Sequence, residues 1–296
     1  MKFAKAHGLG NDFILVAAER VPEAPASWAR RLCDRHVGVG ADGILAYALR
    51  DGGIAMRLIN ADGSDAEISA NGLRCLAAYA VSQGWLPARH VVFTTPGPRP
   101  VEVAELGAGR YRIATDLGTP ILSSREIPCL VEPPLDVVLD WPLLAAGQRV
   151  NVTATSLGNP HCAVFLKEPP DDARIALLGP ALESHAAFPQ GTNVEFVRVL
   201  NRGELRVRFW ERGVGPTCAS GTGAASAAVA AMLHGRVDRA VRVVCDGGVL
   251  DVEWPEGGHV RQVGDVELLF SGEWLADVPA ALGTPGASRS LLDRER

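Results

Sequence analysis

The sequence lacks the features that mark membrane, secreted and nucleic-acid-binding proteins. Its longest run of small apolar residues, 224–233, is too short to cross a bilayer, and its N-terminus has no long apolar segment typical of a signal peptide. The 29 Lys and Arg are outnumbered by 34 Asp and Glu, and no basic run is present, which argues against a surface that tracks a phosphate backbone. We therefore expect a cytoplasmic protein that binds neither nucleic acid nor a membrane.

Paired cysteines are also missing. The 6 cysteines are scattered along the chain without C-x-x-C spacing, so we expect no metal site built from thiolates. In a reducing cytoplasm they are expected to be free thiols, several of them filling space in the core.

The chain has enough apolar residues for two cores. It is 296 residues long and 47% hydrophobic, although only 6% of its residues are aromatic. A chain of this length fits two domains of about 130–150 residues each.

Two short, Ala-rich segments begin in the same way, each on a serine. They span residues 69–84 and 220–235, and in both a glycine closes the segment fifteen residues after the serine. A strand led by arginine precedes each segment and ends at Asn60 or Glu211, nine residues before the serine. Because neither segment has a polar face, each is predicted to be a buried central helix.

The repeat extends upstream of the two helices. A Gly-Asn turn followed by an apolar strand places Asn11 58 residues before Ser69, and a second such turn places Asn159 61 residues before Ser220. These near-equal spacings predict an α+β fold with two pseudo-symmetric domains, each a curved sheet wrapped around its central helix. A Gly-Thr-Pro linker suggests domains at 1–118 and 119–265, with a charged tail at 277–296.

The two helix starts predict an anion site. Each start presents unpaired N–H groups and the positive end of the helix dipole, so two starts facing each other across an interdomain cleft could grip one carboxylate. The alternative is that Ser69 and Ser220 serve only as N-caps.

Polar residues near the helix starts suit an amino-acid ligand. Glu211 can hold an ammonium group and Arg212 can hold a carboxylate, unless the two form an ordinary surface ion pair. Asn11 and Asn159 each offer a donor and an acceptor, although both could be simple turn residues.

These residues and several motifs resemble the diaminopimelate epimerase family. The matching segments, in the order in which that family has them, are His7–Phe13, Asp34–His36, Gly40–Asp42, Asn60–Ser64, Asn71–Gly72, Arg74–Cys75, Gly158–His161, Asn193–Val194, Glu211–Gly213 and Gly221–Gly223. The Ser-Gly-Glu run at 271–273 resembles the strand, at about 266–276, that closes the family's first domain.

The resemblance implies an enzyme that needs no cofactor and no metal, forms homodimers and binds a small amino acid between its domains. It would interconvert LL- and meso-diaminopimelate, in lysine and peptidoglycan biosynthesis, by two-base proton transfer from the positions of Ser69 and Ser220. Binding of the α-carboxylate is implied for Ala70, Asn71, Gly221 and Thr222. Asn60 and Glu211 would hold the α-amino group. The distal end of the substrate would be read by Asn11, Asn159, Asn193 and Arg212.

The family's catalytic pair is cysteine, whereas this chain has serine at both positions. A thiol has a pKa of ~8.5, and a hydroxyl pKa about 5 units higher would cost roughly 7 kcal/mol more to ionise, or about 10⁵ in rate. Ala70, Pro216 and Gly43 also depart from the family's usual residues, and Cys218 could be a displaced thiol.

Slow turnover as a diaminopimelate epimerase is therefore the leading hypothesis. Two others stay open: a related epimerase or dehydratase that acts on another amino acid, and a protein that binds an amino acid without catalysis.

Overall fold

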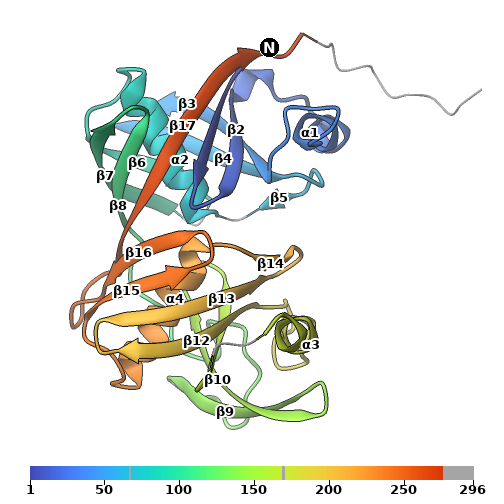
Figure 1. Cartoon of the computed structure of the whole chain (residues 1–296), viewed down its shortest axis with the longest axis vertical. Helices are drawn as coiled ribbons and strands as arrows, with labels where there is room; N and C mark the ends of the chain where they lie inside the picture. Colours follow the sequence, from blue (N-terminus) through green and yellow to red (C-terminus); the bar gives the residue numbers. More distant parts are fainter. Residues whose placement is uncertain (67, 96, 169–170, 276–296) are drawn as a thin grey trace, which may run out of the picture.

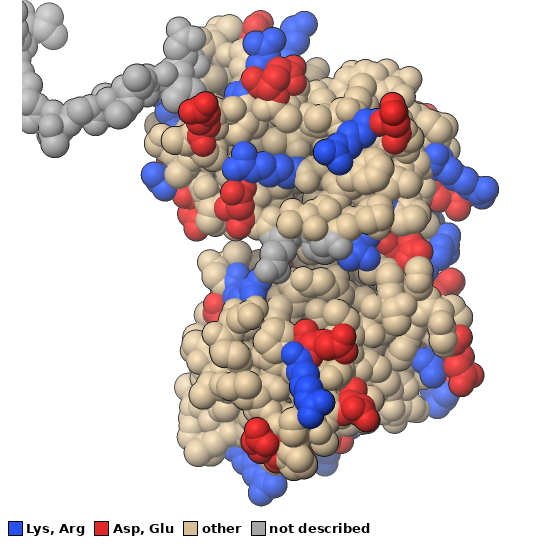
Figure 2. Space-filling view, turned by 180° about the vertical axis from the view of Figure 1, so that it is seen from behind, with Lys and Arg blue, Asp and Glu red and all other residues tan. Residues whose placement is uncertain are grey.

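A computed structural model of the chain describes residues 1–66, 68–95, 97–168 and 171–275. It has two halves stacked along the long axis, one built mainly from the N-terminal part of the chain and the other from the C-terminal part (Figure 1). On the face seen in Figure 2, Lys and Arg side chains are interspersed with Asp and Glu, and neither sign gathers into a continuous patch. The predicted tail at 277–296 lies outside the described residues.

Among its described residues, the first half contains eight strands and two α-helices. The strands are β1 (Lys2–Gly8), β2 (Asn11–Ala17), β3 (Gly43–Arg50), β4 (Gly53–Asn60), β5 (Asp65–Ala66), β6 (Arg89–Thr94), β7 (Gly97–Gly107) and β8 (Arg110–Asp116). The helices are α1 (Pro25–Cys33) and α2 (Ala70–Ser82), and a short 3-10 turn, η1, covers Ala18–Arg20.

After one additional strand, the second half repeats this order of strands and α-helices. Its strands are β9 (Val138–Ala145), β10 (Gln148–Ser156), β11 (Pro160–Phe165), β12 (Asn193–Asn201), β13 (Glu204–Glu211), β14 (Gly215–Thr217), β15 (Ala240–Cys245), β16 (Gly248–Glu253) and β17 (Arg261–Glu273). Its helices are α3 (Asp172–Glu183) and α4 (Gly221–Leu233).

Strand pairing repeats between the halves. In the first half, β1–β2, β3–β4 and β6–β7 are antiparallel, while β2–β3 and β4–β6 are parallel. In the second half, β10–β11, β12–β13 and β15–β16 are antiparallel, while β11–β12 and β13–β15 are parallel. The predicted α+β fold with two similar halves is therefore confirmed.

One long strand, β17, joins the halves. Its first residues pair with β16, residues 261–267 pair with β8, and residues 267–273 pair with β1. The strand expected to close the first domain at about 266–276 thus begins earlier, at Arg261, because it also completes the sheet of the second half.

The two serine-led helices occupy the centres of the halves, as predicted. Every residue of α4 from Gly221 to Met232 is buried, and ten of the residues of α2 are buried. Gly84 and Gly235 follow the helices with φ of 68° and 65°, a left-handed conformation that ends a helix at little cost for glycine.

The outer helix α3 was not among the elements expected from sequence. It begins on Asp171, whose carboxylate accepts a hydrogen bond from Arg174 N, and it lies between β11 and β12 as α1 lies between β2 and β3. It packs Ile175, Leu178 and Leu182 onto an outer core, so both faces of the sheet are covered in each half.

Within the described residues, no helix is long and apolar enough to cross a membrane.

Removal of the first cap is expected to weaken α2. Ser69 has an extended backbone and its Oγ accepts a hydrogen bond from Gly72 N at 3.1 Å. Ser69→Ala should lower the free energy of unfolding by about 1 kcal/mol, measured by urea unfolding. Ser27→Ala, at an exposed position within α1, is the control and should change it by less than about 0.5 kcal/mol. Equal losses in the two variants would contradict the capping role.

Candidate active site between the halves

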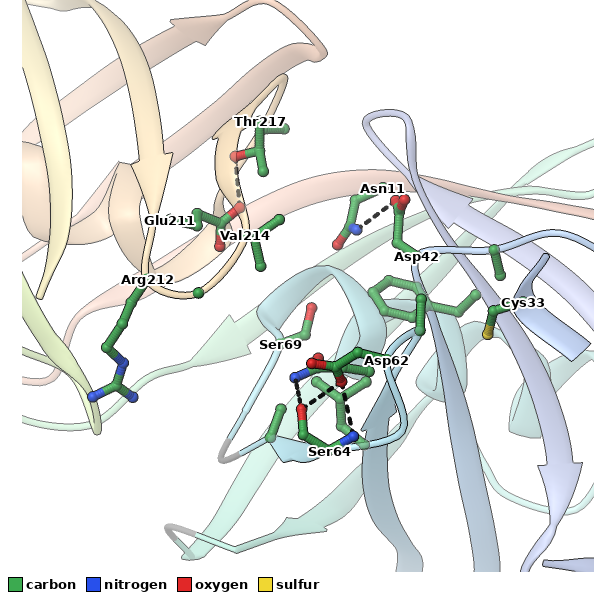
Figure 3. A pocket seen from close by; sticks show the side chains of 18 of the residues that line it. Asn11, Cys33, Asp42, Asp62, Ser64, Ser69, Glu211, Arg212, Val214 and Thr217 are labelled. Carbon is green, nitrogen blue, oxygen red and sulfur yellow. Dashed lines mark hydrogen bonds between the residues drawn. The ribbon is translucent and has the colours of Figure 1, made fainter. Parts of the chain in front are cut away.

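A cavity of about 1000 Å³ is lined by residues from both halves. Seven of the twelve site residues expected from sequence line it, namely Asn11, Asn60, Ser69, Asn159, Asn193, Glu211 and Arg212. Figure 3 shows Ser69, Asp62 and Ser64 on one side of this space and Glu211 with Thr217 on the other. The start of α2 at Ser69 and the ends of the strands that precede both central helices therefore converge on one space.

Both serines act as N-caps. Ser220 Oγ accepts a hydrogen bond from Gly223 N at 3.3 Å, as Ser69 Oγ does from Gly72 N. The two differ in exposure, because Ser69 lines the cavity whereas Ser220 is only 4% exposed and is absent from the lining. Each serine therefore has a structural role as a helix cap. The backbone N–H groups of the first two residues of each helix still have no partner within the helix.

Glu211 lies beside Ser220 at the end of β13. Its Oε1 accepts a hydrogen bond from Thr217 Oγ1 at 2.6 Å (Figure 3). Its Oε2 accepts one from Ser220 Oγ at 3.2 Å. Burial raises the pKa of Glu211, and the hydrogen bonds from Thr217 and Ser220 offset part of that rise. Glu211 is thus a cavity-facing carboxylate and not half of a simple surface ion pair.

Asn60 holds the matching place in the first half, at the end of β4. Its Nδ2 donates to Ser64 Oγ at 3.0 Å, and Ser64 Oγ donates to Asp62 Oδ1 at 2.6 Å. The two strand ends therefore present different groups to the cavity: a neutral amide from the first half and a carboxylate from the second.

A buried histidine lies behind Ser220. His161 Nδ1 is 2.7 Å from Glu195 Oε1, and its Nε2 is 3.0 Å from Asn159 Oδ1. A Cβ placed on Gly223 would lie 2.9 Å from Ser220 Oγ and 3.0 Å from Glu195 Oε1, so this pair borders the serine. Burial raises the pKa of Glu195, although His161 counteracts the rise.

The closeness of this pair to Ser220 was not predicted from the sequence. His161 was part of a matched motif but received no role, because sequence separation hid its closeness to position 220. Both of its ring nitrogens are taken by Glu195 and Asn159, so the imidazole positions Asn159 and does not bond to the serine hydroxyl.

Asn193 and Arg212 are joined through the backbone. Asn193 Nδ2 donates to Pro160 O at 2.9 Å, and its Oδ1 accepts from Arg212 N at 3.0 Å. The Arg212 guanidinium donates to Gln190 O at 3.1 Å. These bonds fix the amide of Asn193 in the cavity wall.

A charged cluster supports Asn11 on the opposite wall. Asn11 Nδ2 donates to Asp42 Oδ2 at 2.8 Å, and Arg35 bridges Asp42 and Asp12 at 2.9 and 2.7 Å. Burial raises the pKa of Asp12, but hydrogen bonds from Arg35 and Lys5 outweigh this effect and lower it to about 2. Asp42 and Arg35 line the cavity and were missed as site residues, although both stood in matched motifs.

The remaining predicted residues lie beneath the cavity and not in its lining. Ala70, Asn71, Gly221 and Thr222 are buried where the two helix starts meet. A Cβ placed on Gly221 would lie only 2.5 Å from the Ala70 Cβ, so little space separates the two starts. Asn71 Nδ2 reaches Asn11 Oδ1 at 3.3 Å and thereby connects this buried layer to the cavity wall.

Of the six cysteines, Cys218 alone is exposed, and it lines the cavity together with Cys33. Cys33 is buried, which raises its pKa to about 12. All six are free, as expected. The described part of the chain contains no group of three or more His, Cys, Asp or Glu residues that could hold a metal ion.

The fold is shared with a solved amino-acid epimerase. A hydroxyproline epimerase from Agrobacterium vitis, solved with bound trans-4-hydroxy-L-proline, matches with a TM-score of 0.67 at 13% identity, over 92% of this chain and 90% of that chain. With its cavity between two similar halves, this chain has the architecture of that class of isomerase.

Sequence comparison gives the family. The model of the diaminopimelate epimerase family matches residues 3–122 and 153–269, and the chain belongs to this family of isomerases. A diaminopimelate epimerase from Pelotomaculum thermopropionicum is 44% identical over 279 residues, which are 93% of this chain and 99% of the relative. One from Desulforudis audaxviator is 46% identical over 282 residues, with the same shares covered.

Proposed function

We propose that this chain binds diaminopimelate in the cavity between its halves and interconverts the LL and meso forms slowly, by proton transfer at the α-carbon. The observation that carries the proposal is the convergence of seven predicted site residues, from both halves, on one cavity. Membership of the diaminopimelate epimerase family is the reason for proposing diaminopimelate as the substrate. We further propose a cytoplasmic homodimer that uses no cofactor, with domains at 1–118 and 119–265.

The substrate groups are assigned by charge. The Glu211 carboxylate would hold the α-ammonium group, with the Asn60 amide on the other side of the cavity. The free N–H groups at residues 70–71 and 221–222 would bind the α-carboxylate. The distal end of the substrate would meet Asn11, Asn159, Asn193 and Arg212.

The reaction needs two groups on opposite faces of the α-carbon. One face loses the α-proton to a base, which leaves a carbanion stabilised by the carboxylate, and the other face receives a proton from an acid. Ser69 and Ser220 hold these places, and each hydroxyl is a far weaker acid than a thiol. Ionising one would cost roughly 7 kcal/mol more than ionising a thiol, so turnover is expected to be slow.

A protein that binds its ligand without catalysis is the second candidate. It is favoured by the hydrogen bonds of both serine hydroxyls, which are engaged as helix caps. The third hypothesis, a related reaction on another amino acid, has no observation in its favour beyond the fold.

The proposal predicts binding with little exchange. Incubation of the protein with LL-diaminopimelate in D₂O should raise its Tm, while the α-proton signal followed by NMR persists over hours. Rapid loss of that signal would contradict the argument that the hydroxyls are weak bases. Absence of any Tm shift or NMR line broadening would contradict the substrate assignment. A diamine of the same length without carboxylates is the control and should give no Tm shift.

A further inference from the structure

The junction of the two central helices contains a buried charge with no opposite charge beside it. Arg74 is 0% exposed, and no carboxylate among the described residues lies within ion-pair distance of it. Asp265 is the acidic group that acts on it, and Asp265 pairs with Arg112 at 2.7 Å. Burial lowers the pKa of Arg74 to about 10, so the side chain is charged at neutral pH.

Neutral amides hold the Arg74 guanidinium. Its Nη1 donates to Gln262 Oε1 at 2.5 Å, its Nη2 donates to Asn71 Oδ1, and its Nε has no partner. Gly264 on β17 makes room for it, since a Cβ there would lie 3.0 Å from Arg74 Cζ. The cost of burying a single cation, several kcal/mol in general, is therefore only partly offset within the chain.

One side chain connects the Arg74 guanidinium to the first turn of each central helix, Asn71 for α2 and Gln262 for α4. Helical side chains lean toward the N-terminus of their helix, so Arg74 reaches back to Asn71 in the first turn of α2. Gln262 Nε2 donates to Gly221 O, in the first turn of α4, at 2.7 Å. Asn71 also contacts Ala219 O at 3.5 Å. Two positive helix ends and one guanidinium therefore lie close together. Their mutual repulsion is unfavourable, and a bound anion would offset it.

We propose that Arg74 is the resident counter-charge for the α-carboxylate of the ligand, acting through space from beneath the two helix starts. This inference rests on the proposed function for the identity of the ligand. Arg74, which does not line the cavity, would thus contribute part of the affinity for the anion. Asn71 and Gln262 would then solvate the guanidinium with neutral amide oxygens and contribute no charge of their own.

A structural brace is the competing role, because the same contacts tie α2 to β17 and α4. Charge and bracing can be separated by three variants. Arg74→Gln removes the charge and keeps a polar side chain. Arg74→Lys keeps the charge and loses the planar fork. Gln262→Met cuts the link to Gly221 without changing the charge.

The experiment measures Kd for LL-diaminopimelate by calorimetry in the full chain and the three variants. We expect Kd to rise roughly ten- to a hundredfold in Arg74→Gln and to stay within about threefold in Arg74→Lys and Gln262→Met. Equal losses in all three variants would show a brace, and unchanged affinity in Arg74→Gln would overturn the proposal.

A second probe separates this inference from the proposed function. If the unchanged protein fails to bind diaminopimelate, the proposed function fails, and sodium sulfate replaces the ligand. Because sulfate also stabilises proteins without a binding site, it is used at millimolar concentration against sodium chloride of equal ionic strength. Sulfate should then raise the Tm of the unchanged protein and of Arg74→Lys more than that of Arg74→Gln. The same shift in all three proteins would overturn the counter-charge role.

Discussion

Replacing both serines with cysteine, in the double variant Ser69→Cys, Ser220→Cys, is expected to raise the rate of α-proton exchange by about 10⁵. The gain follows from acidity alone: a thiol of pKa ~8.5, lowered further at a helix N-terminus, supplies a base at neutral pH that a hydroxyl does not. No other part of the cavity needs to change for this effect.

The surroundings assign different roles to the two new thiols. Position 69 is half-buried at a helix start, and within the described residues Ser69 is not hydrogen-bonded to a carboxylate. Position 220 is hydrogen-bonded to the Glu211 carboxylate, which opposes ionisation of a thiol. We therefore expect the thiolate at 69 and the thiol at 220 before substrate binds. Burial raises the pKa of Cys75, inside α2, to about 12, so this thiol is not expected to act as a base in proton transfer.

Exchange of the α-proton in D₂O, followed by NMR, measures this gain. The single variants Ser69→Cys and Ser220→Cys should each gain far less than the double variant, because epimerisation needs a group on each face. Cys218→Ser in the unchanged protein is the control for a displaced thiol and should leave the residual rate unaltered. A double variant that binds diaminopimelate as tightly as the parent but exchanges no faster would refute the acidity argument.

The repeated elements were predictable because the sequence itself is duplicated. Two serines, two glycine stops and two Gly-Asn turns specified the central helices and the strands around them. Helix α3 was not predicted from the sequence, because Gly179 and Pro180 together normally mark a turn. In the structure Gly179 lies where a Cβ would be 2.4 Å from the Trp210 ring, so glycine serves close packing within a helix.

The walls of the site were harder to predict than its centre. Glu195 and His161 are separated by 34 residues in sequence and meet only because β11 and β12 pair in parallel. The buried layer of Asn71, Arg74 and Gln262 depends on β17, because Gln262 on that strand hydrogen-bonds to Arg74 in α2 and to Gly221 O in α4. A pattern of neighbouring residues in the sequence does not indicate which distant strands will pair.

Loss of the Glu211 charge is expected to abolish most ligand binding. Glu211→Gln removes the carboxylate assigned to the α-ammonium group and leaves that cation without a partner in a cavity wall. Truncating one partner of such a pair costs about 2–5 kcal/mol, or roughly thirtyfold to several thousandfold in Kd. Calorimetric titration with LL-diaminopimelate measures the loss. Glu102→Gln, which removes an exposed partner of Arg89, is the control and should leave Kd unchanged.

The pH dependence identifies the charge as the cause. Because burial raises the pKa of Glu211, affinity should fall as the pH drops through that raised value and should level off above it. In Glu211→Gln this dependence should disappear. Stability should change in the opposite sense: a raised pKa in the folded state favours the protonated carboxyl, so the stability that Glu211 contributes is lost as pH rises through that value. The unliganded glutamine variant should therefore be at least as stable as the parent at neutral pH, while binding far more weakly. A variant that is destabilised and binds normally would place Glu211 in the framework of the fold and not in the binding site.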